Sequence, residues 1–357
     1  MLNKIYFTPG PTQLYYTVPD HIKSALRNDI GSISHRSKAF EKVFIETREN
    51  LKALLGLPDS YEIYFTSSAN EIWERIIQNF VEHSSHHFAN GSFSKKFYEF
   101  THQYNRNSTL EESEPGVHYK NFNIPAQAEL ISCTLNETSI GYQFPTEEIY
   151  QLKEKHPDKL MSVDGVSAFP CVKFDFSKVD TAYFSVQKSF GQPSGLGVWI
   201  MNHACIEKAA SLDAKGLPTG SYHRLSELRK HGAKNQTPET PNTLGIYLLG
   251  KVAKDMLDRG VQNIQNETIY KSSILYQALT DHPDFEPFIE DKKYRSKTVI
   301  VAKCKKGSTS VLERFKAKGW ILGSGYGTFK ADHIRIANFP MHSKEQIEQL
   351  CDFIQTF

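Results

Sequence analysis

The sequence predicts an α/β protein whose large domain contains a mostly parallel β-sheet and whose smaller C-terminal domain is α+β. Between residues 61 and 200, short strand-like runs alternate with helical patterns. Strands that alternate with helices of about 10–15 residues are typical of βαβ units and therefore of a parallel sheet. Beyond Ile200 this alternation ends, and long helical patterns precede short strands and helices. We assign residues 15–255 to the large domain, and residues 1–14 with 256–357 to the small domain.

In the large domain, small or polar turns separate strand patterns from the helices that follow. The helix expected at 39–55 ends at Gly56 and Pro58, because glycine and proline stop a helix there. The expected order is an extended arm at 1–17, helices at 20–27 and 39–55, a strand at 61–65, a helix at 71–81, a helix ending at 104, a strand at 128–134, a helix at 146–156, a strand ending at 164, a strand from 183 and a strand opening at 197.

The C-terminal third has a different pattern. Residues 221–235 are polar and basic without a clean period, and a proline-containing loop at 236–242 then opens a long helix. The expected order is a helix at 206–211, helices at 243–259 and 262–279, a strand at 298–303, a short element at 312–318, a glycine-rich stretch at 323–327, a strand at 333–337 and a helix at 344–356.

Composition narrows the class of protein. A net charge of +2 gives no reason to expect a nucleic-acid or membrane partner. The five cysteines are scattered without a CxxC pair, which argues against a disulfide framework or a zinc site and for a reducing compartment. No run approaches the roughly 20 apolar residues of a membrane span, and the N-terminus has no apolar segment typical of a signal peptide. We therefore expect a cytoplasmic enzyme that binds no metal.

The chemistry centres on a lysine and an aspartate. Lys188 lies at the polar tip between two strand patterns, and Asp164 ends an earlier strand. Ligands of open α/β sheets bind at the carboxyl ends of strands. Pyridoxal phosphate needs an amine to form an imine with its aldehyde and an anion to keep its ring nitrogen protonated. This pair therefore predicts a pyridoxal 5'-phosphate site, although a lone lysine beside a turn is usually solvated.

Other polar tips supply candidate ligands, each with an ordinary alternative. The turn at 66–70 contains Ser68, Ala69 and Asn70, and it either binds a phosphate at a helix N-terminus or is a common N-cap. Phe93 either stacks on the pyridine ring or belongs to the core. Thr138 either contacts the cofactor's phenolic oxygen or satisfies its own turn. Ser185 and Gln187, which shortly precede Lys188 in the sequence, are candidates for the phosphate.

Basic residues suggest how an anionic substrate would bind. Arg335 lies between Ile334 and Ile336 in a strand, so its forked guanidinium either takes a substrate carboxylate or forms an internal salt bridge. His35 and Arg36 form a basic pair in the loop before the 39–55 helix. They either grip a distal anionic group of the substrate or form a solvated surface pair.

In this order the motifs resemble the class V aminotransferases of fold type I, and the phosphoserine aminotransferases most closely. The resemblance covers nearly the whole chain, and Gln187-Lys188 downstream of Val163-Asp164 is its most specific part. The other matching segments are Phe7–Pro11, Ser34–Phe40, Asn136–Thr138, Thr237–Pro241, Ile246–Gly250 and Arg335.

The resemblance implies a three-layer large domain, amino-acid and 2-oxo-acid substrates, and a role in serine biosynthesis. Lys188 would bind the cofactor and move a proton at the substrate Cα, and Asp164 would keep the ring nitrogen protonated. Phe93 would stack on the ring in the place of the family's usual tryptophan. Gln236, in the place of an asparagine, and Thr237 would reach the phosphate from a neighbouring subunit, which implies a homodimer.

Two departures from the family pattern leave the substrate open. The family has a glycine-rich stretch that includes an arginine where this chain has residues 67–70, which contain neither glycine nor arginine. The family also has a histidine–arginine pair in the region of residues 328–330, and this chain lacks that pair. The lower positive charge makes a serine– or alanine–glyoxylate (or pyruvate) aminotransferase the first alternative. A cysteine desulfurase-like lyase is the second, with Cys304 as its loop-side nucleophile. The third, a non-catalytic protein, has no need of the Asp164–Lys188 pair.

Overall fold

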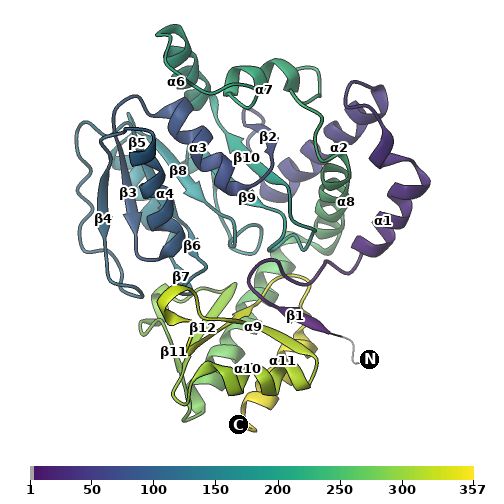
Figure 1. Ribbon diagram of the computed structural model, residues 1–357, viewed down its shortest axis with the longest axis vertical. Coiled ribbons are helices and arrows are strands. Elements are labelled where there is room, and N and C mark those ends of the chain that lie inside the picture. The colour runs from purple at the N-terminus through teal and green to yellow at the C-terminus, as the bar shows by residue number, and fades with distance from the viewer. Residues whose placement is uncertain (1–3) are drawn as a thin grey trace.

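The computed structural model of the protein describes residues 4–357 and contains two main β-sheets, one above the other in Figure 1. Residues 1–3 of our small domain lie outside this described part. The strands are Ile5–Phe7 (β1), Glu62–Thr66 (β2), Ser85–Ala89 (β3), Thr109–Glu112 (β4), Leu130–Thr134 (β5), Asn136–Glu137 (β6), Tyr142–Gln143 (β7), Leu160–Asp164 (β8), Thr181–Ser185 (β9), Gly197–Met201 (β10), Phe285–Pro287 (β11), Val299–Cys304 (β12), Trp320–Ser324 (β13) and His333–Ala337 (β14).

The helices agree closely with the periodic patterns of the sequence. They are Val18–Arg27 (α1), Lys38–Leu55 (α2), Ala69–Phe80 (α3), Ser92–Gln103 (α4), Thr146–Lys155 (α5), His203–Ala214 (α6), Leu225–Gly232 (α7), Thr243–Arg259 (α8), Val261–Asp281 (α9), Ser308–Ala317 (α10) and Lys344–Ile354 (α11). Short 3-10 helices occur at Ile30–Ser32 (η1), Phe176–Lys178 (η2), Lys292–Tyr294 (η3) and Gly327–Phe329 (η4).

The larger sheet has seven strands in the order β2-β10-β9-β8-β5-β3-β4. The pairs from β9 to β4 are parallel, and β10 runs antiparallel to both of its neighbours. The prediction of a mostly parallel sheet is therefore confirmed. The strands β3, β5, β8, β9 and β10 are buried throughout, as expected for strands covered on both faces.

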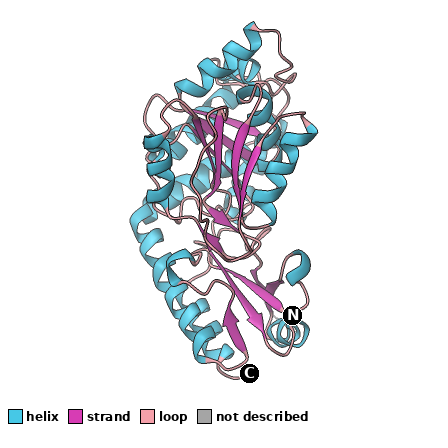
Figure 2. Cartoon of the chain, turned by 90° about the vertical axis from the view of Figure 1, so that its left-hand side faces the viewer, coloured by secondary structure: helices cyan, strands magenta, loops and turns pink. Residues whose placement is uncertain are grey.

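Helices cover both faces of this sheet, which gives the three layers visible in Figure 2. Alternate residues of each strand point to opposite faces. In β9, Ala182 and Phe184 join the core on the α2 and α8 side, and Tyr183 joins the core on the α3 and α4 side. The two-residue period of the strand thus divides one sequence run between two cores.

The second sheet has the order β1-β13-β14-β12-β11 and packs against α9, α10 and α11. The N-terminal strand β1 pairs in parallel with β13, so the arm crosses to the C-terminal sheet before the chain enters the large domain. In Figure 1, the long helix α9 links the part around the large sheet to the lower sheet.

Several elements differ from the sequence-based expectation, which named no strand at the positions of β4, β6, β7, β11 or β13. Residues 221–235, which show no clean period, contain the short helix α7, whose buried side chains include Leu225 and Leu228. Two apolar residues are too few to produce a helical period in sequence, and packing supplies the rest. The element expected at 312–318 is the helix α10, which begins at Ser308.

Within residues 4–357, every helix is too short or too polar to cross a bilayer.

Candidate active site

A cavity of about 200 Å³ lies at the carboxyl ends of the central strands, where the N-terminal arm and the second sheet meet them. Residues proposed from the sequence that line it are Ala69, Asn70, Phe93, Thr138, Asp164, Ser185, Gln187, Lys188 and Arg335. These residues come from several elements far apart in the chain. Their convergence follows from the parallel sheet, since the carboxyl ends of its strands meet at one edge.

Lys188 and Asp164 are both buried in this cavity. Burial lowers the pKa of Lys188 to about 8, although the charge of Asp164 acts in the opposite direction and raises it. Burial raises the pKa of Asp164 to about 6, while the Val166 N–H at 3.0 Å from Oδ1 and the charge of Lys188 lower it. A lysine with a lowered pKa has a larger neutral, nucleophilic fraction at neutral pH. The pair therefore combines an available amine with an anionic partner.

Thr138 and Phe93 contact the amine of Lys188. The Nζ atom donates a hydrogen bond to Thr138 Oγ1 at 3.0 Å and lies 5.2 Å from the centre of the Phe93 ring. Thr138 Oγ1 is also 2.8 Å from Ser167 Oγ, which accepts a hydrogen bond from Asn136 Nδ2 at 2.7 Å. A chain of side-chain hydrogen bonds thus orients the threonine hydroxyl.

Glu137 fixes the position of Phe93, and sequence reasoning missed this role. Its fully buried carboxylate accepts hydrogen bonds from the backbone N–H groups of Phe93 at 3.4 Å and Ser94 at 2.9 Å. A carboxylate at the start of α4 is also favoured by the helix dipole. A Cβ at Gly91 would come within 2.3 Å of Glu137 Cγ, so glycine is needed beside it. An acid inside an apolar-flanked turn was the available signal in sequence.

The turn before α3 offers a helix N-terminus to the cavity. The Ala69 N–H donates to Ser185 Oγ at 2.8 Å, which draws the turn against β9. Ser68 is outside the cavity lining, and its hydroxyl accepts the Glu71 N–H at 3.3 Å as an N-cap. Gln187 lines the cavity, and its buried Oε1 has no hydrogen-bond partner among residues 4–357. A helix N-terminus, whose backbone N–H groups donate hydrogen bonds, is a suitable place for a phosphate.

Arg335 reaches the cavity from the second sheet. Its Nε donates to the Ser324 carbonyl at 2.7 Å, and its guanidinium carbon lies 5.3 Å from the centre of the Tyr326 ring. Tyr326 also packs on Phe93, with ring centres 5.1 Å apart. Within the described chain, no carboxylate forms an ion pair with Arg335, so the internal salt bridge considered from the sequence is absent. Burial lowers the pKa of Arg335, and an anionic ligand would offset that desolvation.

The N-terminal arm closes one side of the cavity at Gly10. This residue has a φ of +124°, and a Cβ built on it would lie 2.9 Å from Lys188 Cε. Only glycine satisfies both the backbone conformation and the contact.

We expect Gly10→Ala to lower kcat about 10- to 100-fold, because displacing a reacting group by about 1 Å has effects of this size. The measurement is steady-state kinetics together with thermal unfolding. Gly56→Ala is the matched control, since Gly56 also has positive φ (+63°) but open space around its Cβ position. Equal loss of kcat in both variants would show that the Lys188 contact is irrelevant.

Four residues proposed from the sequence form a separate group outside the cavity within one chain. Arg36 Nη1 donates to Gln236 Oε1 at 3.0 Å and to the Thr237 carbonyl at 2.8 Å, and Nη2 donates to the Pro238 carbonyl at 2.9 Å. His35 adjoins Arg36 in the same loop. Arg36 is therefore neither free nor in contact with Lys188, and it holds the loop at 236–238.

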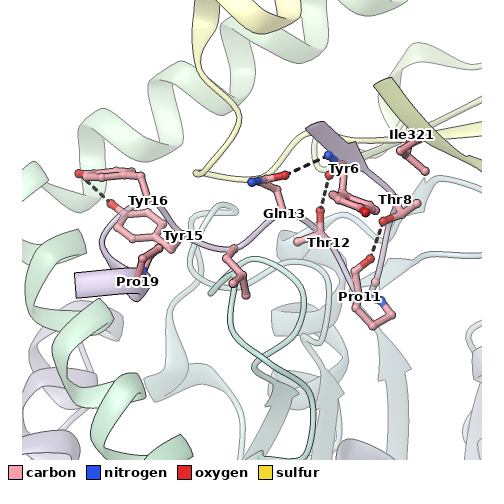
Figure 3. Close-up of a pocket in the computed structure, with 11 residues that line it drawn as sticks. Tyr6, Thr8, Pro11, Thr12, Gln13, Tyr15, Tyr16, Pro19 and Ile321 are labelled. Carbon is pink, nitrogen blue, oxygen red and sulfur yellow. Dashed lines mark hydrogen bonds between the residues drawn. The ribbon is translucent and has the colours of Figure 1, made fainter. Parts of the chain in front are cut away.

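A larger cavity of about 800 Å³ lies along the outer side of the arm (Figure 3). Its lining includes the exposed side chains Tyr6, Leu14 and Tyr16, and it contains no charged residue. The Tyr15 and Tyr16 hydroxyls face one another at 3.4 Å, and Gln13 Oε1 accepts the Tyr6 N–H at 3.0 Å. Without an acid, a base or a free cation, this cavity lacks the groups that the chemistry requires, despite its size.

A buried histidine links the turn before α3 to the loop at 236–242. His223 lies between Glu71, which it contacts through Nδ1, and Glu239, whose Oε2 is 2.9 Å from Nε2. Burial lowers the pKa of His223, but the ion pairs with Glu239 and Glu71 outweigh this and raise it to about 9. Burial raises the pKa of Glu71, but His223 and Ser67 outweigh this and lower it to about 2. The sequence contained no signal for this cluster, because its members are far apart in the chain.

We expect His223→Gln to lower the free energy of unfolding by about 3 kcal/mol, a typical cost of leaving buried charges unpaired. Because the folded pKa of His223 is raised, its contribution is complete below its unfolded value of 6.5 and disappears as the pH rises toward 9. The difference between wild type and variant should therefore shrink between pH 6.5 and 9 in chemical denaturation. His203→Gln, at an exposed pair with Glu207, is the control and should show little difference at any pH.

Metal and thiol chemistry receive no support from the described residues. Residues 4–357 contain no cluster of three His, Cys, Asp or Glu side chains that could hold a metal ion. Cys304 is the last residue of β12 and is buried, and burial raises its pKa to about 12. The expectation that Cys304 is a loop-side nucleophile is therefore wrong, because its thiol is neither mobile nor readily ionised.

Comparisons with known proteins converge on one family. The family model for class V aminotransferases matches residues 110–325. A solved structure of a phosphoserine aminotransferase from Cytophaga hutchinsonii is 46% identical, with a TM-score of 0.98 over 100% of this chain and 99% of that chain. A putative phosphoserine aminotransferase from Mycobacterium leprae is 26% identical over 98% of this chain and 93% of its own length. An aspartate aminotransferase from Thermus thermophilus, 19% identical with a TM-score of 0.86 over 99% of this chain and 98% of that chain, shares the fold.

Proposed function

The chain belongs to the class V aminotransferases, which depend on pyridoxal 5'-phosphate, and from this membership we propose that it transfers amino groups between a 2-oxo acid and amino acids of the phosphoserine and glutamate type. Relatives named phosphoserine aminotransferases support the substrate class. The observation that carries the proposal is one cavity that holds Lys188, Asp164 and an Arg335 without a carboxylate partner in the described chain.

The cavity residues fit the cofactor. Its phosphate would lie at the N-terminus of α3, with Ala69, Asn70, Ser185 and the side-chain NH₂ group of Gln187 as ligands. The Thr138 hydroxyl would face its phenolic oxygen, and the Phe93 ring would cover its pyridine ring. When bound, the cofactor supplies an aldehyde for amine exchange and an electron-accepting ring.

The chain's own groups would bind the substrate and move its proton. Arg335 would hold the substrate carboxylate through the guanidinium nitrogens that Ser324 does not use. Lys188 Nζ would accept the proton from the substrate Cα and hold it beside the reacting atoms. Its lowered pKa near 8 suits a group that exchanges protons at neutral pH. Asp164 would keep the positive charge on the ring nitrogen.

We further propose a homodimer in which each cavity is completed by the partner subunit. Lys188 and Arg335 are the only cations in the described cavity lining, which is little positive charge for a substrate with a phosphate and a carboxylate. The group formed by His35, Arg36, Gln236 and Thr237 would supply further donors from the second copy. The exposed apolar side chains of the arm would be covered by the same association.

The shared site can be tested by co-expressing two inactive chains. A Lys188→Ala chain and an Arg36→Ala chain each lack one half of every site in a homodimer. A mixed dimer would contain one site with both residues intact, so it should recover up to half of the wild-type activity per dimer. No recovery in a purified mixed dimer would contradict a shared site.

The substrate is tested by mixing the protein with one amino donor at a time and following the visible absorbance of the bound cofactor. We expect phosphoserine and glutamate to convert the cofactor, and free serine and alanine to do so at least about 100-fold less efficiently, since charged hydrogen bonds are then missing. Conversion by serine or alanine alone would instead assign the chain to small neutral amino acids. Five free cysteines agree with the reducing environment of the cytoplasm, which we propose as its compartment.

A further inference from the structure

Two buried side chains without assigned roles lie beside Asp164. The register of the parallel pair β8–β9 places Asp164 directly opposite Tyr183. Trp73, from α3, lines the same cavity as Asp164. Trp73 is 2% exposed and Tyr183 is fully buried. An aspartate at the end of a central strand thus has a phenol and an indole as neighbours from two different elements.

The polar atoms of both neighbours lack other partners. Within residues 4–357, neither Trp73 Nε1 nor Tyr183 Oη has a hydrogen-bond partner, although both atoms are buried. A buried donor left unpaired costs about 1–3 kcal/mol, so a fold retains two of them when something compensates. The carboxylate of Asp164 is the adjacent acceptor, and among residues 4–357 it accepts one hydrogen bond, from the Val166 N–H at 3.0 Å.

Aromatic packing restricts where these donors can turn. The Trp73 indole lies nearly parallel to Phe97, with ring centres 5.5 Å apart and an angle of 12°. Phe97 meets the Tyr183 ring edge to face at 6.3 Å and 85°. The three rings form one packed group on the α3 and α4 side of the sheet, which restricts how far the indole and the phenol can turn.

The charges around Asp164 agree with this arrangement. Burial raises the pKa of Asp164 and thereby disfavours the anion, while the nearby Trp73 indole lowers it. Burial raises the pKa of Tyr183 most strongly, and the charge of Asp164 raises it further. The phenol therefore stays protonated and able to donate. The other charged groups that act on Asp164 are Lys188, which favours its anion, and Glu137, which opposes it. An anion in such a site needs donors besides Val166.

We propose that Trp73 and Tyr183 are positioning residues that hold the Asp164 carboxylate from behind and aim its free oxygen into the cavity toward the cofactor's ring nitrogen. This inference rests on the proposed function, in which Asp164 pairs with that nitrogen. With the carboxylate held by these two donors, the ring nitrogen would meet an acceptor of fixed direction.

The test uses Trp73→Phe and Tyr183→Phe, which keep an aromatic ring and remove the donor. In the full chain without cofactor, the titration midpoint of the Asp164 carboxyl, followed by infrared difference spectroscopy with labelled aspartate, should rise by about one unit in each variant. With cofactor, kcat should fall about tenfold while the KM for the amino donor changes little.

The matched control is Trp199→Phe. Trp199 belongs to the same core but does not line the cavity. Its substitution removes a buried indole hydrogen bond, from Nε1 to Thr181 Oγ1 at 2.9 Å. It should lose stability without moving the Asp164 titration. In an Asp164→Asn background, Trp73→Phe and Tyr183→Phe should add no further loss of kcat, because the group they position is gone.

The outcomes separate this proposal from the proposed function. An unchanged Asp164 titration in both variants, with stability losses like that of Trp199→Phe, would make Trp73 and Tyr183 ordinary core residues. The Asp164 titration could shift in the variants while none of the tested amino donors converts the bound cofactor. That result would keep the positioning role and overturn the proposed amino transfer. A full further loss of kcat in the Asp164→Asn background would also contradict the proposal.

Discussion

Replacing Lys188 by alanine should abolish amino transfer and the visible absorbance of lysine-bound cofactor together. The side chain supplies both the amine that binds the cofactor and the base that moves the Cα proton, and general acid–base catalysis alone contributes about 10²–10⁴-fold. We therefore expect kcat to fall by about 10⁴-fold or more. The fold should persist, because removing a buried amine relieves a desolvation cost while sacrificing one hydrogen bond, to Thr138.

A second buried lysine provides the control for this experiment. Lys271 is fully buried, and burial lowers its pKa to about 8, as it does for Lys188. Its Nζ donates to the carbonyls of Phe339 at 3.1 Å and His342 at 2.7 Å, away from the cavity. Lys271→Ala should lower thermal stability yet keep the absorbance of lysine-bound cofactor. A Lys188→Ala protein that retains both absorbance and activity would show that the central assignment is wrong.

The second large effect is expected at Arg335. Arg335→Gln should raise the KM of the amino donor about 10²- to 10⁴-fold, because it removes two charge-assisted hydrogen bonds to the substrate carboxylate, each worth about 1.5–3 kcal/mol. Cofactor affinity should change little, since the residue faces the substrate. The measurement is kcat and KM for the amino acid, compared with a primary amine that lacks the carboxylate and should react equally with both proteins.

Arg295 is a close structural match for Arg335 outside the cavity. Its Nε donates to the Ile289 carbonyl at 2.8 Å and its guanidinium carbon lies 5.0 Å from the Tyr276 ring. The corresponding distances for Arg335 are 2.7 Å to Ser324 and 5.3 Å to Tyr326. Arg295→Gln should leave KM unchanged. If both variants raise KM equally, the effect comes from lost packing rather than from carboxylate binding.

The parts of this protein that could be predicted are those in which one segment carries the information. Alternating strands and helices predicted the parallel sheet, and the rule that ligands bind at strand carboxyl ends placed Thr138, Asp164 and Lys188 on one rim. The same rule placed Phe93 at this rim. In each case a side chain at the end of a local pattern could be assigned to a common edge without knowledge of distant contacts.

Other features depend on residues that meet across long stretches of chain. Arg36 bonds to Thr237, 201 positions later, so its role in holding the loop at 236–238 could not be derived from the basic pair in which it occurs. His223 lies between Glu71 and Glu239 for the same reason. The buried placement of Cys304 at a strand end corrected the idea of a loop nucleophile.

Local periodicity encodes which face of an element is buried, and here it was enough to establish the sheet, its rim and the lysine–aspartate pair. It does not encode which elements pack against one another. Gly10 on Lys188, Glu137 behind Phe93, and Trp73 with Tyr183 beside Asp164 are contacts between such elements. Close packing of the folded chain creates them, because only there do burial and unpaired polar groups force particular side chains together.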